Sequence, residues 1–138
     1  MRERTTEATR LHPMNKRIQS LPGSSIDESI LAEVRRGIGH GETVLVVLDS
    51  DHTAAHVRQE LEMYAPLVTP GSYLVVFDGV MEMLADAPNG LPEWATDNPS
   101  AAVREFLGEH PEFEAEPRFN RLGATYAPGG FLRRREAA

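Results

Sequence analysis

The chain has 138 residues, of which 41% are hydrophobic, so it is long enough for one core and too short for two ordinary domains. Its formal net charge of -7 argues against a nucleic acid partner, because phosphate binding needs a basic surface. The absence of cysteine excludes disulfides, thiolate catalysis and cysteine-ligated zinc. No apolar run reaches membrane-spanning length, so we expect a cytoplasmic protein with no membrane partner.

The amino-terminal third predicts three elements. Helix formers and polar residues in 1–12 predict a short helix or a loose arm. Residues 17–22 alternate in polarity and predict a short strand. An apolar stripe over 27–36 predicts a helix, with Ser25 or Asp27 as its N-cap.

Two strongly apolar runs follow, and each ends on an aspartate. The run 43–48 precedes Asp49, and the run 73–77 precedes Asp78. A helical stripe over 53–64 lies between them. Strand, helix and strand joined by short connections are typical of right-handed parallel βαβ units. We therefore predict a Rossmann-like, doubly wound α/β fold with a mostly parallel sheet.

The carboxy-terminal part predicts a loop, a helix and a hairpin. Residues 83–99 are rich in proline and predict a long, lid-like binding loop. Residues 100–107 predict a helix. The segments 113–126 and 131–134 predict the strands of a closing antiparallel hairpin, and 134–138 a solvated tail. Residues 1–138 thus form one domain.

The two aspartates that end the apolar runs are the strongest candidates for a site. In open α/β sheets, ligands bind beyond the carboxyl ends of the strands, so Asp49 and Asp78 are expected to converge. Two such carboxylates are suited to hold Mg²⁺, with water in the remaining positions. Taken singly, each aspartate is better explained as a strand end that caps the following helix, and it is the agreement of the two with a family pattern that favours a metal site.

Two other patterns overlap this site. The segment DSDHT at 49–53 matches the DxDxT signature of haloacid-dehalogenase-like phosphohydrolases, although no lysine follows Lys16 to hold a phosphoryl group. His52 and His56 have the four-residue spacing of zinc ligands on a helix, but no third ligand completes the set. We therefore interpret His56 as a packing or surface histidine.

The glycines at positions 37, 39 and 41 resemble a cofactor-binding glycine loop. Such a loop must follow a strand and open a helix, whereas these glycines follow a predicted helix and precede a strand. We interpret them as a helix C-cap and the turn into the strand.

Four segments read together resemble the family of cephalosporin hydroxylases and rhamnosyl O-methyltransferases. They are GSSID at 23–27, the long block 44–78, the tripeptide DNP at 97–99 and APGGFLRR at 127–134. The resemblance implies a class I S-adenosylmethionine-dependent methyltransferase fold that ends in an antiparallel hairpin. It also implies O-methylation of a small-molecule hydroxyl on a sugar or secondary metabolite.

The resemblance also implies roles for individual residues. The turn that contacts the adenine of S-adenosylmethionine corresponds to Ser24, Ser25, Ile26 and Asp27. Asp49 and Asp78 correspond to ligands of Mg²⁺, and Glu82 is a further candidate ligand or acid. His52 corresponds to the base that removes the acceptor's hydroxyl proton, a task for which a neutral imidazole beside Mg²⁺ is suited.

Family members carry a further amino-terminal stretch with the first two strands, the glycine-rich cofactor loop and the ribose-binding acid. We therefore expect the carboxy-terminal part of a methyltransferase domain, with impaired or absent cofactor binding. Its open strand edges are expected to be covered by a second copy in a homo-oligomer or by a partner chain. The alternative functions are a non-catalytic structural or assembly protein and, third, a phosphohydrolase.

Overall fold

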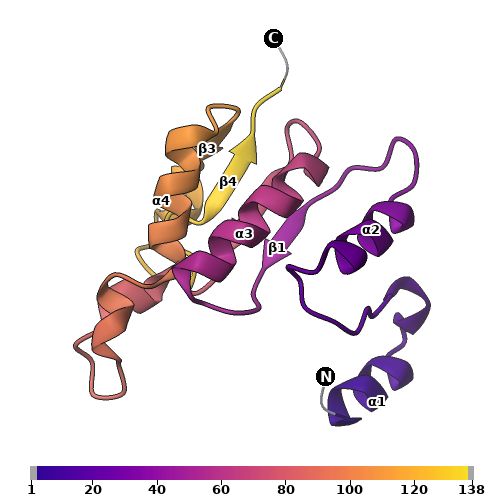
Figure 1. The fold of residues 1–138 in the computed structure, drawn as a ribbon, viewed down its shortest axis with the longest axis horizontal. Coiled ribbons are helices and arrows are strands. Elements are labelled where there is room, and N and C mark those ends of the chain that lie inside the picture. Colours follow the sequence, from indigo (N-terminus) through magenta and orange to yellow (C-terminus); the bar gives the residue numbers. More distant parts are fainter. Residues whose placement is uncertain (1–2, 137–138) are drawn as a thin grey trace.

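A computed structural model of the chain describes residues 3–136 and the side chains of residues 7–136 (Figure 1). The α-helices are α1 (Glu3–Leu11), α2 (Glu28–Gly37), α3 (Ala54–Tyr64) and α4 (Pro99–Glu109). The strands are β1 (Val46–Leu48), β2 (Tyr73–Val76), β3 (Phe113–Ala115) and β4 (Phe131–Arg134). Short 3-10 helices are η1 (Asn15–Arg17), η2 (Ala65–Leu67), η3 (Gly79–Leu84), η4 (Pro92–Ala95) and η5 (Pro117–Asn120). No helix among these is both long and apolar enough to cross a membrane.

The strands form one mixed sheet in the order β1-β2-β4-β3. β1 and β2 are parallel, whereas β4 pairs antiparallel with both β2 and β3. The α/β class and the closing antiparallel pair are confirmed, but the prediction of a mostly parallel sheet is wrong. The reason is that β4 enters the sheet between β2 and β3, so both of its pairings are antiparallel.

The hydrophobic core lies on the helix-covered face of the sheet. Helices α3 and α4 run side by side over that face (Figure 1). Alternate residues of the strands point into this layer, as the two-residue period of a strand requires. The core residues are Leu48, Val57, Leu61, Val68, Leu74, Val76, Val103, Phe106, Phe113 and Leu132. Burying each such side chain contributes about 1.5–3 kcal/mol to folding.

The opposite face of the sheet carries no α-helix in the described part of the chain. The Phe119 ring of η5 packs there against Phe131, with 4.6 Å between ring centroids, and against Tyr73 at 5.7 Å. Over β1 the same face is open, and Leu45 is 54% and Val47 51% exposed. The doubly wound arrangement is therefore not seen within residues 3–136, because α3 and α4 share one face.

The amino-terminal predictions are partly confirmed. A helix forms at α1, although residues 1–2 lie outside the described residues. The predicted strand 17–22 is wrong, because this exposed segment has no neighbouring strand to pair its backbone groups. The α2 helix is confirmed, and Asp27 rather than Ser25 caps it, since the Asp27 carboxylate accepts the Ser29 N–H at 2.8 Å.

The carboxy-terminal predictions need three corrections. The strand predicted for 113–126 ends at Ala115, because Pro117 cannot donate a ladder hydrogen bond and opens η5 instead. The lid-like stretch 83–99 is not wholly irregular, since it contains η4. The predicted tail 134–138 begins too early, because Arg134 still belongs to β4 and its N–H donates to the Ser72 carbonyl beside β2; residues 137–138 lie outside the described residues.

Candidate functional site

The carboxyl ends of β1 and β2 bring two aspartates to one edge of the sheet. The strands are parallel and in register, with Leu48 opposite Val76. The Phe77 N–H donates to the Leu48 carbonyl at 3.0 Å and holds the strand ends together. Asp49 follows β1 directly, and Asp78 follows β2 after one residue. Both carboxylates therefore leave the sheet at the place where ligands bind in open α/β sheets.

His52 lies between these two carboxylates. Its Nε2 is 3.1 Å from Asp78 Oδ2 and 3.7 Å from Asp49 Oδ1. One ligand atom from each residue lies within 4.8 Å of the other two. Although the distance to Asp78 is short, the angle is not that of a hydrogen bond, and His52 Nε2 is buried without a hydrogen-bond partner. We call Asp49, His52 and Asp78 the edge cluster.

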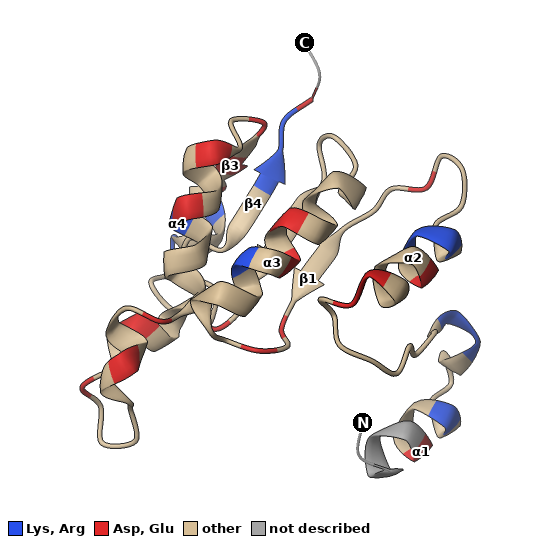
Figure 2. Ribbon diagram, viewed as in Figure 1, with Lys and Arg blue, Asp and Glu red and all other residues tan. Residues whose placement is uncertain are grey.

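The edge cluster has no cationic partner other than its own histidine among the described residues. Figure 2 shows acidic residues along the loop that follows β1. With a neutral imidazole the cluster carries two uncompensated negative charges, which favour a bound cation. Carboxylate oxygens suit Mg²⁺, and the imidazole nitrogen widens the choice to Mn²⁺ and similar ions. The residues present thus fit a divalent cation.

The backbone at Asp78 is itself unusual. With φ at 56°, Asp78 is the one non-glycine residue with positive φ among those described. Aspartate tolerates this left-handed conformation better than most residues, but it still costs about 1–2 kcal/mol. The next residue, Gly79, is confined, because a Cβ there would lie 2.6 Å from Ser100 Oγ. The turn aims the Asp78 carboxylate toward His52 and leaves no room for a side-chain ligand at position 79.

Glu82 does not join the edge cluster. Its two carboxylate oxygens each accept a hydrogen bond from the Arg104 guanidinium at 2.8 Å. These hydrogen bonds lower the pKa of Glu82. The structure therefore directs Glu82 toward α4, away from the ends of β1 and β2.

The predicted adenine-contacting turn, residues 24–27, lies beside the end of β1. Ser25 Oγ is 3.1 Å from His56 Nε2 and 3.4 Å from Ser50 Oγ. The Tyr64 hydroxyl donates to the Ser25 carbonyl at 2.8 Å. Asp27 N–H donates to the Ser24 carbonyl, which closes the turn before α2. The turn is thus fixed against α3 and the residue that follows Asp49.

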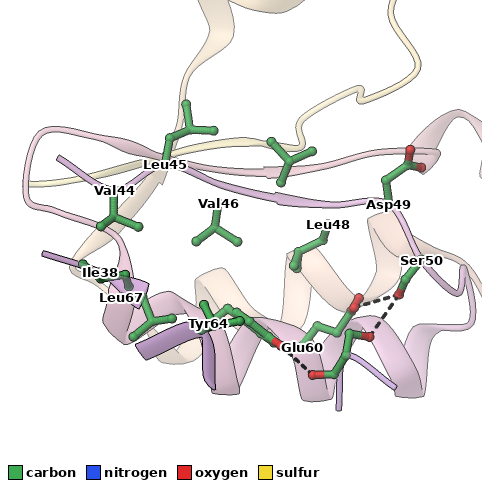
Figure 3. A pocket seen from close by; sticks show the side chains of 13 residues that line it. Ile38, Val44, Leu45, Val46, Leu48, Asp49, Ser50, Glu60, Tyr64 and Leu67 are labelled. Atoms are coloured by element: carbon green, nitrogen blue, oxygen red, sulfur yellow. Dashed lines mark hydrogen bonds between the residues drawn. The ribbon is translucent and has the colours of Figure 1, made fainter. Parts of the chain in front are cut away.

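A buried glutamate anchors this arrangement. Glu60 is 2% exposed, and its Oε1 accepts the Ser50 hydroxyl at 2.7 Å. His56 Nε2 lies 3.7 Å from the same oxygen, whereas Oε2 has no partner among the described residues. Figure 3 shows Glu60 and Ser50 at one end of a cavity of about 440 Å³ whose other end is apolar. His56, interpreted from the sequence as a packing or surface histidine, is partly buried here and contacts the Ser25 and Ser50 hydroxyls.

Sequence reasoning missed the role of Glu60, although one signal was present. Val57, Leu61 and Tyr64 form the apolar stripe of α3, and position 60 falls on the same helix face. A glutamate inside an apolar stripe is expected to be buried with a partner. The identity of that partner, Ser50, depends on the tertiary fold.

Asp51 has a local structural role. Its Oδ1 accepts hydrogen bonds from Thr53, from the hydroxyl at 2.7 Å and from the N–H at 2.9 Å. These bonds, the hydroxyl first, lower the pKa of Asp51. The Asp51 carboxylate is thus used in the turn that precedes α3.

The chain thus has an α/β sheet with an acidic, histidine-containing cluster at the carboxyl ends of its parallel strands, the place where open α/β sheets generally bind ligands. The profile of the family described as Rhamnosyl O-methyltransferase/CmcI matches residues 1–135. The chain therefore belongs to the rhamnosyl O-methyltransferase/CmcI family.

Curated relatives agree with this assignment. The rhamnosyl O-methyltransferases of Mycobacterium bovis (strain BCG / Pasteur 1173P2) and Mycobacterium tuberculosis (strain ATCC 25618 / H37Rv) are each 34% identical over 113 residues, covering 79% of this chain and 44% of the relative. The Mycobacterium leprae (strain TN) protein is 35% identical over 99 residues, or 67% of this chain and 39% of the relative. The matches thus span less than half the length of these relatives. No solved structure matches the chain significantly.

Proposed function

We propose that this protein acts in the transfer of a methyl group from S-adenosylmethionine to a hydroxyl of a sugar or secondary metabolite. Family membership supports methyltransferase chemistry, with S-adenosylmethionine as donor and a small molecule as acceptor. The relatives are rhamnosyl O-methyltransferases, which supports a rhamnosyl acceptor. The observation that carries the proposal is the edge cluster, where His52 Nε2 lies within 3.7 Å of both Asp49 and Asp78.

In the proposed reaction, the edge cluster removes the proton of the acceptor hydroxyl. An acceptor hydroxyl must lose its proton as its oxygen attacks the methyl carbon of the sulfonium donor, from which S-adenosylhomocysteine departs. We assign the acceptance of this proton to His52 Nε2, which has no other hydrogen-bond partner. The carboxylates of Asp49 and Asp78, 3.7 Å and 3.1 Å from Nε2, favour the charged form of the imidazole. When bound by these two carboxylates, Mg²⁺ supplies a further lowering of the hydroxyl pKa.

We assign contact with the donor to the turn of Ser24, Ser25, Ile26 and Asp27. The position of this turn supports the assignment. The hydroxyl oxygens of Ser25 and Ser50 are 3.4 Å apart, and Ser50 directly follows Asp49 of the edge cluster. The glycines at 37, 39 and 41 precede β1 and do not open a helix, so they supply no phosphate- or cofactor-type loop. We therefore expect calorimetry to show weak or absent binding of S-adenosylmethionine by the chain alone, and micromolar affinity would contradict this expectation.

Methyl transfer tests the proposal directly. The chain would be incubated with Mg²⁺, a rhamnoside and methyl-labelled S-adenosylmethionine in large excess, to offset the weak cofactor binding expected above, and the labelled product counted. His52→Gln should lower the rate at least 100-fold, the usual scale for a lost general base. His40→Gln, in the exposed turn after α2, is the matched control and should retain the rate. Equal rates in the two variants would remove the base role, and no transfer by any variant would favour a non-catalytic protein.

The non-catalytic alternative has its own observation. In the described part of the chain, β1 has a neighbour on one side only, and Leu45 and Val47 are more than half exposed beside this free edge. Such an edge is a template for pairing with another chain. We propose that a second copy or a partner chain covers it, through contacts that survive high salt because they are apolar. A monodisperse monomer in light scattering at low micromolar concentration would contradict this.

A further inference from the structure

The edge cluster is carried by two chain segments that leave different strands. His52 lies between β1 and α3, whereas Asp78 lies between β2 and η3. The sheet fixes where the two segments begin, but His52 comes four residues after the end of β1. A reacting group and its partner must be held to within about 0.5 Å of their working positions. The fold therefore needs contacts that hold these two segments in place beyond the strand ends.

The first such contact comes from Asp97, which precedes α4. Its Oδ1 accepts the Ala54 N–H at 2.6 Å. Ala54 opens α3 two residues after His52, and the N–H groups of a first helical turn have no acceptor within their own helix. The hydroxyl of Thr53, the N-cap residue, donates instead to Asp51 Oδ1 at 2.7 Å. The start of α3 is thus held by a residue 43 positions away, where α4 begins beside it (Figure 1).

The second contact comes from Ser100, in the first turn of α4. Its hydroxyl donates to the Gly79 carbonyl at 3.1 Å, and Gly79 directly follows Asp78. The approach is close, because a Cβ at Gly79 would lie 2.6 Å from Ser100 Oγ. The start of α4 therefore holds the backbone that carries Asp78, just as it holds the backbone that carries His52.

The start of α4 is itself anchored by Asn98, which is fully buried. Asn98 Oδ1 accepts the Ala101 N–H at 2.9 Å and caps α4. Its Nδ2 donates to the Trp94 carbonyl at 2.8 Å and ties α4 to η4. These hydrogen bonds fix the start of α4 without using the edge cluster. We call residues 97–100 the clamp, because they bind the chain next to both sides of the edge cluster.

We propose that Asp97 and Ser100 are positioning residues for the edge cluster. Asp97 acts on the segment that carries His52, through one main-chain hydrogen bond. Ser100 acts in the same way on the segment that carries Asp78. Together they set the separation of 3.1 Å between His52 Nε2 and Asp78 Oδ2. This inference rests on the proposed function, because the separation matters to a reaction only if His52 accepts the proton of the acceptor.

Nuclear magnetic resonance tests the clamp without donor or acceptor. The chain has five histidines, and the ring signal of His52 is the one that His52→Gln removes. At a fixed pH, we expect Asp97→Ala and Ser100→Ala to move this signal and to leave that of His110 in place. Asp97→Asn should restore it, because the amide oxygen accepts the same N–H. Asp86→Ala is the matched control, since it removes an exposed aspartate from the loop before the clamp.

The methyl-transfer assay gives the second test, through the difference between kcat and KM. A displaced base slows the chemical step but removes no contact with the acceptor. Asp97→Ala should therefore lower kcat about tenfold or more and leave KM within about twofold. Ser100→Ala should act likewise. Asp97→Asn and Asp86→Ala should keep the kcat of the unchanged chain.

The outcomes separate the clamp from the reaction. A moved His52 signal in Asp97→Ala and Ser100→Ala, with no methyl transfer by the unchanged chain, would support the clamp and overturn the proposed function. Methyl transfer with the same kcat in both variants would overturn the positioning role and leave the function standing. A lower melting temperature with an unmoved His52 signal would also overturn it, since the clamp would then serve stability alone. So would a lost kcat in Asp97→Asn, because the charge and not the hydrogen bond would be responsible.

Discussion

The chain places two histidines between pairs of carboxylates, His52 at the carboxyl ends of β1 and β2 and His110 at the end of α4. Both ring nitrogens of His110 are used: Nδ1 lies 3.0 Å from Glu112 Oε1, and Nε2 lies 3.2 Å from the Glu62 carboxylate. Its ring also stacks on buried Phe106, with centroids 4.1 Å apart. His52 Nε2, by contrast, has no hydrogen-bond partner.

The two histidines also differ in whether an arginine pairs with the carboxylates around them. Arg58 forms ion pairs with Glu62, Glu105 and Glu109, so these carboxylates near His110 share an arginine partner. The carboxylates beside His52 have no arginine or lysine partner in the described residues. Geometry alone would allow a metal ion at either place. Unused hydrogen-bonding capacity and the lack of an arginine or lysine partner favour a ligand at the edge cluster, whereas the hydrogen bonds and ion pairs already made in the His110 cluster favour a structural role.

Removing the Phe106 ring, which stacks on His110, should give the largest loss of stability among the variants considered. Phe106 is fully buried and also packs against Phe113, with centroids 5.4 Å apart. Phe106→Ala is therefore expected to lower the free energy of unfolding by about 3–5 kcal/mol in urea denaturation. Phe119→Ala is the control, because Phe119 is 47% exposed and should cost less. A loss below about 1 kcal/mol for Phe106→Ala would contradict this account of the core.

The buried carboxylate of Glu60 offers a second test, because one of its oxygens accepts a hydrogen bond and the other has no partner among the described residues. Ser50→Ala removes the hydroxyl that donates to Glu60 Oε1 at 2.7 Å. Because the other carboxylate oxygen of Glu60 already has no partner, the loss of this hydrogen bond should lower the free energy of unfolding by about 1–3 kcal/mol. The melting temperature should fall accordingly, whereas Ser20→Ala at an exposed position should leave it unchanged. Equal melting temperatures of the two variants would show that Ser50 does not anchor Glu60.

The pH dependence of stability should follow His110. Burial opposes its charged form, but hydrogen bonds with Glu112 and Glu62 outweigh burial and raise the pKa of His110. A raised pKa adds stability that is fully present below the unfolded value of about 6.5 and is lost as the pH rises through the folded value. The free energy of unfolding should therefore fall on raising the pH from about 6 to 8, by up to about 1 kcal/mol.

His110→Gln should flatten this pH profile, and His40→Gln should leave it unchanged. Glu112 contributes with the opposite sign, because its hydrogen bond with His110 lowers the pKa of Glu112. That contribution is present above the unfolded pKa of the carboxyl group and is lost as the pH falls through the lowered folded value. An unchanged profile in His110→Gln above pH 6 would contradict the structural role of this histidine.

The smallest effect is expected for the pair of Glu82 and Arg104. The Arg104 side chain is 59% exposed, so Arg104→Ala should cost only about 0.2–1 kcal/mol in urea denaturation. It should leave Mg²⁺ affinity unchanged, because Glu82 lies outside the edge cluster. A tenfold change in Mg²⁺ affinity would return Glu82 to the site.

Much of the fold was predictable where local pattern decides the structure. The apolar runs ending at Asp49 and Asp78 and the stripe of α3 gave correct elements, because burial on one face needs only a periodic sequence. Residues 17–22 also alternate, but a strand exists only where another strand pairs with it. The insertion of β4 between β2 and β3 depends on long-range pairing, which no local pattern records.

The candidate site, too, was only partly predictable from the sequence. The rule that parallel strand ends meet at one edge was enough to predict that Asp49 and Asp78 come together, whereas His52 was placed beside them by the family resemblance. The bond between Ser50 and Glu60 joins residues ten apart through the packing of α3 on the end of β1. Such contacts between elements follow from the tertiary arrangement and leave only indirect traces in the sequence.

Calorimetric titration with Mg²⁺ tests most directly the claim that one histidine cluster binds a cation and the other does not. The chain and Glu62→Gln, which alters the His110 cluster, should bind Mg²⁺ alike, and at 100 times the Kd binding should add about 2.7 kcal/mol to stability. Asp49→Asn and Asp78→Asn should each lose this binding. Unchanged binding in both aspartate variants, or its loss in Glu62→Gln, would contradict the assignment of the edge cluster as the metal site.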